Sequence, residues 1–201
     1  MKAVLYEIPP HWLKERKNSD ASQWDEMWDG VLHMCPVPTG RHQDLAYDLR
    51  DHLKRWWAKP FGNRVCGERN LTTPGDEAEW TKNYRIPDLV LLDPPRFGID
   101  KNAYLAGAPL VVVEIRSPGD ESYEKRDFYA RLGVPEVWVI DRDTRSPEVF
   151  VLSAGGYQKA AADAGGWVVS PATGVRMQAA GGKLRVQVGD DLATLADLPD
   201  E

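Results

Sequence analysis

The chain has 201 residues, of which 42% are hydrophobic and 28% charged, values typical of one globular domain with a substantial core. Its formal net charge of −6 gives no support for a protein that coats nucleic acid, because such proteins are usually basic. No apolar run approaches the roughly 18 residues that cross a membrane, and the start lacks the apolar stretch of a secretory signal. Cys35 and Cys66 form no CxxC pattern, so we expect a reducing, cytoplasmic location.

The first elements in chain order are predicted to be two short helices and a strand. Residues 9–17 are compatible with a short helix entered through proline. Residues 20–28 carry Trp24 and Trp28 at helical spacing, which predicts a second helix with a packed face. Residues 31–34 then follow a turn and are typical of a strand.

The clearest helix is predicted at residues 41–59. Its apolar positions repeat every four residues, at Leu45, Leu49, Leu53 and Trp57. Thr39 is a candidate N-cap, and Pro60 is expected to end the helix. Trp56 and Trp57 cannot both occupy the centre of one narrow buried stripe. The pair therefore suggests an exposed aromatic face and a candidate homodimer. An oligomeric structural protein is thus one possible function, weaker than the two given at the end of this section.

The middle of the chain is predicted to alternate strands with one helix. Strands are expected at residues 64–71, 84–92, 110–115, 137–140 and 148–152, the last of these at a sheet edge. A helix is expected at residues 122–132, with Gly133 as its C-cap. The order of helix, three strands, helix and strand predicts an α/β fold with a mixed central sheet flanked by helices.

From residue 153 onward the composition changes, because glycine pairs separate short β-like segments. We interpret residues 153–190 as a β-meander appended to the same core. The sequence thus predicts a single domain over residues 1–201, with its core at about 24–152.

Two acids stand in the apolar strands of the predicted sheet. Asp88 opens one strand and Glu114 closes another, and a buried carboxylate is costly unless it is paired or bound to metal. If the two strands pair, the carboxylates converge at one edge of the sheet, where Mg²⁺ or Mn²⁺ would also accept the backbone carbonyl of Ile115. Glu114 and Arg116 point to the same face, because side chains alternate along a strand. Lys125, in the next helix, is placed to reach the same pocket.

Such a site is suited to phosphodiester chemistry. A bound divalent cation lowers the pKa of its water and neutralises charge on the phosphate during an in-line displacement. The ammonium group of Lys125 would orient that water or stabilise the extra negative charge of the transition state.

Structural interpretations of the same residues stay open. Asp88 could cap a turn, Glu114 could form a buried ion pair with Arg116 or Lys125, and Lys125 could pair with Glu121 on its own helix. Weaker candidates are Glu26 and Glu68 as further acids near the metal, and Asp120 as a helix N-cap rather than a ligand.

The residues around these acids resemble a known signature. Pro87-Asp88, followed after a gap by Glu114-Ile115-Arg116, is similar to the PD-(D/E)XK nuclease motif. A longer set of residues resembles, more specifically, the Uma family of restriction endonucleases. These residues lie at 85–90, 112–118, 123–126 and 129–138. The resemblance spans about residues 24–152, and parts of the C-terminal segment are also similar.

The resemblance implies a restriction-endonuclease-like αβββαβ core and metal binding by Asp88 and Glu114. It departs from the motif at Arg116, where the nucleases have a lysine. Arginine stays protonated and cannot act as a base, although it can clamp a phosphate. In the Uma pattern, a lysine on the next helix takes the place of the motif lysine, and Lys125 matches it. His42 also matches the Uma pattern, but we assign it no catalytic step.

We therefore expect a metal-dependent endonuclease that acts on DNA. The alternative is a catalytically inactive nuclease-fold module that binds nucleic acid or a protein partner. Arg116 at the lysine position and the acidic net charge favour that alternative.

Overall fold

The computed structural model describes residues 3–5, 11, 14–15, 18, 20–75 and 79–200. The short helix expected at residues 9–17 lies mostly outside the described residues. Within the described ranges, no helix is long and apolar enough to cross a membrane.

The central sheet of the molecule runs in the order β12-β11-β10-β9-β7-β4. Its strands are β4 (Arg64–Gly67), β7 (Leu89–Leu92), β9 (Val111–Arg116), β10 (Glu136–Asp141), β11 (Pro147–Ser153) and β12 (Gly156–Lys159). β9 and β10 pair in parallel, whereas the other neighbours pair in antiparallel fashion. This is the expected mixed sheet. The predicted edge strand is instead covered, because β12 pairs with β11.

The pairing of β7 with β9 determines where the two acids lie. Leu89 is opposite Val113 in this antiparallel pair. One step further along both strands, Asp88 therefore comes level with Glu114. The two carboxylates reach the same end of the central sheet through strand register alone.

The long helix differs from expectation at its C-terminal end. It begins as α2 (Gly40–Leu53), continues through a π-helical turn (Lys54–Ala58) and ends in α3 (Lys59–Phe61). The prediction that Pro60 stops the helix was wrong. Pro60 occupies the first turn of α3, where its missing N–H is not needed, and the wider π turn accommodates the change.

The helix instead ends at Gly62, which adopts a left-handed φ of 68°. Thr39 has the extended backbone of an N-cap, but its side chain makes no capping hydrogen bond to any described residue. Within the π turn, Trp57 is buried and Trp56 half-buried. The candidate homodimer stays a prediction.

The second helix of the core, α4 (Arg126–Leu132), is shorter than expected. Residues 122–125 form turns, and Lys125 occupies the N-cap position. Gly133 ends the helix in a left-handed conformation with φ of 83°, as the sequence predicted.

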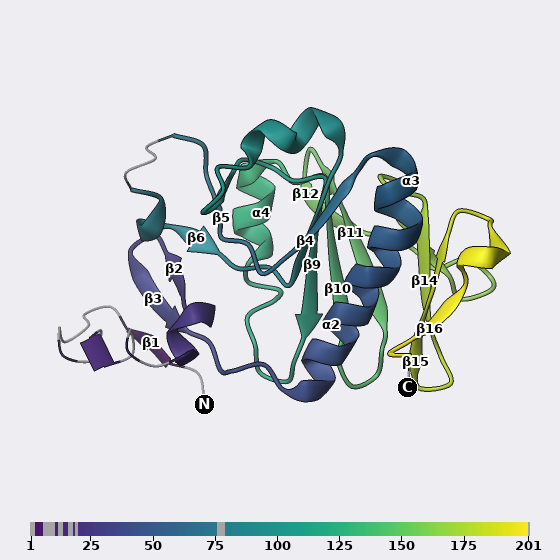
Figure 1. The fold of residues 1–201 in the computed structure, drawn as a ribbon, viewed down its shortest axis with the longest axis horizontal. Coiled ribbons are helices and arrows are strands. Elements are labelled where there is room, and N and C mark those ends of the chain that lie inside the picture. The colour runs from purple at the N-terminus through teal and green to yellow at the C-terminus, as the bar shows by residue number, and fades with distance from the viewer. Residues whose placement is uncertain are drawn as a thin grey trace.

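The central sheet has an apolar core on each face, and a different helix covers each one. One core joins α2 to the sheet and to the C-terminal strands through Leu49, Val113 and Met177. The other packs α4 against the opposite face through Val112 and Phe128. Figure 1 shows the purple N-terminal strands and the yellow C-terminal strands at opposite ends, with the central sheet and α2 between them.

Leu49 offers a test of the α2 packing, because its side chain is fully buried in the core. Leu49→Ala should lower the free energy of unfolding by about 2–5 kcal/mol, through lost apolar burial and the cavity left behind. Tyr47→Ala, at a position on the same helix with 42% exposure, serves as the control and should change it by less than about 1 kcal/mol. Urea titration followed by circular dichroism measures both, and equal effects would contradict this packing.

A second sheet, in the order β1-β3-β2-β6-β5-β8, lies at the N-terminal end of the molecule. Its strands are β1 (Ala3–Leu5), β2 (Glu26–Trp28), β3 (Val31–Met34), β5 (Leu71–Thr72), β6 (Tyr84–Arg85) and β8 (Leu105–Ala106). The strand expected at residues 31–34 is confirmed. The helix expected at residues 20–28 is wrong, because a 3₁₀ turn at Asp20–Trp24 leads into β2.

Two strands predicted as continuous are each divided between the two sheets. Residues 64–71 split into β4 and β5 around Glu68, which has a left-handed φ of 46°. Residues 84–92 split into β6 and β7 around Pro87, which cannot donate a ladder hydrogen bond. Each break lets one stretch of chain join both sheets, and the second break leaves Asp88 between them. Further 3₁₀ turns lie at Trp80–Lys82 and Pro94–Ile99.

The C-terminal strands form the expected β-meander, in the order β13-β14-β15-β16. They are β13 (Val168–Val169), β14 (Val175–Ala180), β15 (Lys183–Val188) and β16 (Ala196–Leu198), with a 3₁₀ turn at Leu192–Thr194 before the last strand. Gly181 and Gly182 both have positive φ and form the two-residue hairpin turn between β14 and β15.

Candidate active site

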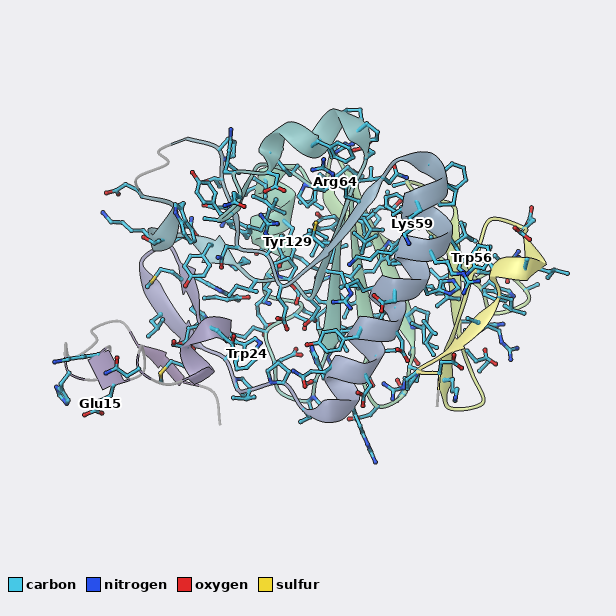
Figure 2. The ribbon with its side chains drawn as sticks, in the orientation of Figure 1. Glu15, Trp24, Trp56, Lys59, Arg64 and Tyr129 are labelled. Atoms are coloured by element: carbon cyan, nitrogen blue, oxygen red, sulfur yellow. The ribbon has the colours of Figure 1, made fainter. Side chains whose placement is uncertain are left out.

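A pocket of about 280 Å³ opens where β7 and β9 meet the N-terminal sheet. Residues from distant parts of the sequence line it, including Glu26, His42, Asp88, Glu114 and Lys125. In Figure 2, Trp24, which also lines the pocket, and Tyr129 lie on one side of α2, whereas Trp56 lies on the other side beside the C-terminal strands.

Two hydrogen bonds fix the Asp88 carboxylate at this pocket. The Ile115 N–H donates to Oδ2 at 2.6 Å, and His42 Nε2 lies 2.7 Å from Oδ1. Burial by itself lowers the pKa of His42, but the nearby carboxylates of Asp88, Glu114 and Asp120, with Asp88 contributing most, together outweigh burial and raise this pKa. His42 also approaches Ser117, with 3.5 Å between Nδ1 and Oγ.

Glu114 is 3% exposed and both of its carboxylate oxygens are engaged. The Tyr129 hydroxyl donates to Oε1 at 2.5 Å, and Lys125 Nζ donates to Oε2 at 3.1 Å. Burial raises the pKa of Glu114 to about 8, against the lowering effect of Lys125. The negative charges of Asp88 and Glu26 raise this pKa further, so each of these two acids repels a negative charge on Glu114.

Lys125 joins two buried acids. Besides Glu114, its Nζ lies 2.8 Å from Oε1 of Glu26, a side chain that is only 1% exposed. Glu26 is held in place by the Ile86 N–H at 2.8 Å and by Nε1 of Trp28 at 2.7 Å. Burial lowers the pKa of Lys125, but the two carboxylates overcome it and raise this pKa well above its usual value. Lys125 therefore carries its proton in the pocket.

Comparisons with known proteins agree with this architecture. The sequence profile of the Uma2 family, described as "Putative restriction endonuclease", matches residues 17–186. The chain belongs to the Uma2 family. A solved structure described as "a putative nuclease belonging to DUF820 from Anabaena variabilis ATCC 29413" is similar to the chain, with a TM-score of 0.58 and 19% identity. That likeness covers 79% of this chain and 88% of the other, and it confirms the expected fold class. The comparison with curated proteins gives no match.

The structure brings most of the sequence-predicted residues of this Uma2 chain together, but not Arg116. Asp88, Glu114, Ile115 and Lys125 all line the pocket. Arg116 lies outside the pocket lining that the described residues form. Its Nη1 is 2.9 Å from Oδ2 of Asp141, and its guanidinium carbon lies 5.3 Å from the centre of the Tyr123 ring.

Three alternatives considered from the sequence take a different form in the structure. Lys125 pairs with Glu26 and Glu114, whereas Oε2 of Glu121 lies 2.8 Å from Nδ1 of His33. Asp120 is not the N-cap of α4, because it binds the N–H groups of Ser117 and Ser122 in the turn before that helix. The pocket lining among described residues does not include Glu68.

In this Uma2 chain, the structure gives Glu26 a closer contact with the site than the sequence predicts, and it adds Tyr129, for which the sequence predicts no role. Glu26 is a weak candidate from the sequence, in which residues 20–28 are predicted to be helical, whereas in the structure it belongs to β2 and lies 2.8 Å from Nζ of Lys125. Tyr129 follows Lys125 by four residues, a spacing that places two side chains on the same helical face and could have revealed it.

The donor set at this Uma2 pocket suits a hard divalent cation. Mg²⁺ and Mn²⁺ commonly take one or two carboxylates together with carbonyl oxygen, water and substrate phosphate. Asp88 and Glu114 place two carboxylates at one end of the sheet, and Ile115 lines the same pocket. A cation would also relieve the repulsion that raises the pKa of Glu114. Among the described residues, no group of three or more His, Cys, Asp or Glu side chains forms a metal site by itself. Backbone carbonyl and water would therefore have to complete the coordination.

Proposed function

We propose that this chain is a metal-dependent endonuclease that hydrolyses phosphodiester bonds in DNA. The observation that supports the proposal most strongly is the convergence of Asp88, Glu114 and Lys125 on one pocket. Membership of a family described as restriction endonucleases is consistent with it.

In the proposed site, Asp88, Glu114 and the Ile115 carbonyl hold Mg²⁺ or Mn²⁺. The cation, when bound, supplies a water of lowered pKa and neutralises charge on the phosphate. Asp88 is oriented for this role by the Ile115 N–H and His42, whose hydrogen bonds fix its carboxylate. The binding of metal requires Glu114 to give up its proton.

Lys125 is proposed to position the attacking water and to stabilise negative charge that develops on the phosphate. Its ammonium is already held in the pocket by Glu26, and Tyr129 positions Glu114 from one turn further along the chain. Arg116 is proposed to contact a substrate phosphate. Its side chain is 36% exposed and forms an ion pair with Asp141. To contact phosphate, its guanidinium would either bind both groups at once or leave Asp141.

Cleavage of supercoiled plasmid and of single-stranded DNA tests the proposal, with Mg²⁺ or Mn²⁺ compared with EDTA. Asp88→Asn keeps the shape of the side chain but removes the negative charge, so the metal-dependent rate should fall by about 100-fold. Asp93→Asn is the matched control, because Asp93 pairs with Arg96 at 2.7 Å and not with the pocket. The absence of cleavage in wild-type protein, or equal rates for wild type and Asp88→Asn, would contradict the proposal.

An inactive DNA-binding module on the same fold is the second candidate. The observation that favours it is Arg116, which stands at the motif's lysine position and binds Asp141. Calorimetric titration with Mn²⁺ separates the two functions. Binding that Glu114→Gln abolishes supports the enzyme, whereas DNA binding without any Mn²⁺ binding supports the module.

A further inference from the structure

Part of the pocket is lined by apolar residues that the proposed metal chemistry does not use. Trp24 ends the 3₁₀ turn before β2, and Met34 ends β3. Pro36, Val37 and Pro38 follow in the link between β3 and α2. We call these five residues the apolar wall. A metal ion binds oxygen atoms here, and a phosphate binds charged or N–H groups, so the apolar wall serves neither.

Strand pairing and side-chain contacts place the apolar wall beside the charged residues of the pocket. Where β2 pairs with β3, Glu26 is opposite the residue that precedes Met34, and Glu26 lies 2.8 Å from Nζ of Lys125. At its other end the link enters α2, where His42 lies 2.7 Å from the carboxylate of Asp88. The link that carries the apolar wall therefore spans from the Lys125 side of the site to the Asp88 side.

The apolar wall is open to an outside ligand. Val37 is 55% exposed, Pro36 is also exposed and Trp24 is half-buried. The link is neither helix nor strand, and its two prolines have no N–H with which to extend a sheet. Ligand pockets are commonly lined by apolar and aromatic side chains together with a few polar groups. The apolar wall therefore suits a ligand that presents an apolar face next to a charged group.

An unpaired nucleotide has both of these features. Its phosphate suits the cationic side chains of Lys125 and Arg142, which line the same pocket. The flat face of its base stacks on aromatic and apolar side chains. In a duplex, the neighbouring base pairs cover that face. Only a base that has left the stack can therefore lie against the apolar wall.

We propose that the apolar wall binds the face of an unpaired nucleobase next to the phosphodiester in the pocket, so that the substrate is single-stranded or locally unpaired DNA. This inference rests on the proposed function for its ligand. Trp24 and Val37 are the residues that distinguish unpaired from paired DNA, and they act in binding rather than in bond cleavage. Because stacking tolerates any base, the preference is for unpaired DNA and not for a sequence.

Fluorescence anisotropy in EDTA and at low KCl tests the apolar wall without any dependence on cleavage. The labelled probes are a short thymidine strand, the same sugar-phosphate strand without bases, and a duplex of equal length. The first two probes carry the same phosphates, so the ratio of their affinities reports on the bases alone. Wild-type protein should bind the thymidine strand about tenfold more tightly than the abasic strand, and more tightly than the duplex.

Val37→Ser removes apolar surface from the wall at an exposed position, where the fold does not depend on it. It should weaken binding of the thymidine strand by about fivefold and leave binding of the abasic strand unchanged. The slope of log K against log salt should stay the same, because no phosphate contact is lost. Val169→Ser is the matched control, since Val169 is 43% exposed in β13 and lies outside the pocket lining of the described residues. Trp24→Leu should weaken binding of the thymidine strand by about tenfold, and its melting temperature verifies folding.

The outcomes separate this inference from the proposed function. A wild-type protein that binds the thymidine strand no better than the abasic strand overturns the inference, even if it cleaves DNA. Equal effects of Val37→Ser and Val169→Ser overturn it as well. So does a Val37→Ser protein that keeps its affinity for the thymidine strand but changes from dimer to monomer in sedimentation, because a second copy then covers the wall. A base-dependent affinity that Val37→Ser reduces, in a protein without metal-dependent cleavage, supports the inference and contradicts only the catalytic proposal.

Discussion

Replacing Glu114 with glutamine should abolish detectable Mn²⁺ binding and lower metal-dependent DNA cleavage by about 1,000-fold. Glutamine has nearly the same shape, so its amide oxygen can still accept a hydrogen bond from Tyr129 or Lys125. What the change removes is the negative charge that the cation requires. Calorimetric titration with Mn²⁺ and a plasmid cleavage assay measure the two effects, and circular dichroism verifies that the fold is kept.

The pH dependence of Mn²⁺ binding gives this prediction a second readout. Burial raises the pKa of Glu114 from 4.5 to about 8, so below about pH 8 the metal must displace a proton. Mn²⁺ affinity should therefore rise by about tenfold per pH unit up to about pH 8 and then level off. Because its pKa is higher in the folded protein, the folded state holds the proton of Glu114 more tightly than the unfolded chain does. Glu114 therefore stabilises the fold most below pH 4.5, and this stabilisation is lost as pH rises to about 8. Glu114→Gln should reduce that pH slope.

Glu148→Gln is the matched control for Glu114→Gln. The Glu148 carboxylate is also held by a tyrosine and a lysine, since Tyr123 donates to it at 2.5 Å and Lys159 forms an ion pair with it. It does not line the pocket formed by the described residues. If Glu114→Gln and Glu148→Gln change Mn²⁺ binding to the same extent, the prediction that Glu114 is a specific ligand is contradicted.

Replacing Lys125 with methionine should lower both DNA cleavage and stability. The cleavage rate should fall by about 1,000-fold, because the pocket loses the ammonium proposed to position water. The free energy of unfolding should fall by about 3–5 kcal/mol, because Glu26 and Glu114 remain buried without their shared cation. Methionine has a similar length and leaves little cavity, so the loss of charge dominates.

The stability cost of Lys125→Met should increase with pH. Below about pH 8 Glu114 is protonated, because burial raises its pKa to about 8, so its ion pair with Lys125 contributes little in either protein. As pH rises, the Glu114–Lys125 pair forms in the wild type, whereas the variant must bury an unpaired Glu114 carboxylate or keep it protonated. Urea titrations at about pH 5 and pH 8 measure the difference. Lys159→Met, at an exposed lysine paired with Glu148, is the control and should cost less than about 1 kcal/mol at either pH.

Cleavage is compared under conditions in which both proteins are folded. A Lys125→Met protein that cleaves DNA within tenfold of wild type would contradict a role for Lys125 in the reaction. A stability cost that is the same at both pH values would contradict the shared ion pair as its cause.

Much of this architecture was predictable because its signals are local. The continuous apolar run at residues 110–115 predicted a strand buried on both faces, and β9 is such a strand. Gly133 predicted the end of α4, because a left-handed C-cap favours glycine. The same local pattern made Glu114 conspicuous as an acid within an apolar strand.

Other features depended on contacts between distant segments. The apolar pattern of residues 84–92 continues across Pro87, yet the two halves join different sheets because each finds a different partner strand. Pro60 lies within the helix because the preceding π turn changes the hydrogen-bond register. Periodicity reports which face of an element is buried, but not the strand against which it is buried.

The sequence alone determined the fold class, the family resemblance, and Asp88, Glu114 and Lys125 as the residues to explain. Only the tertiary structure decided that Lys125 is shared by Glu114 and Glu26, and that Arg116 turns to Asp141 instead of the pocket. The physical reason is that burial and ion pairing are properties of the folded surroundings. Strand register brings Asp88 level with Glu114, and the N-terminal strand β2 then adds the second acid that holds the lysine in place.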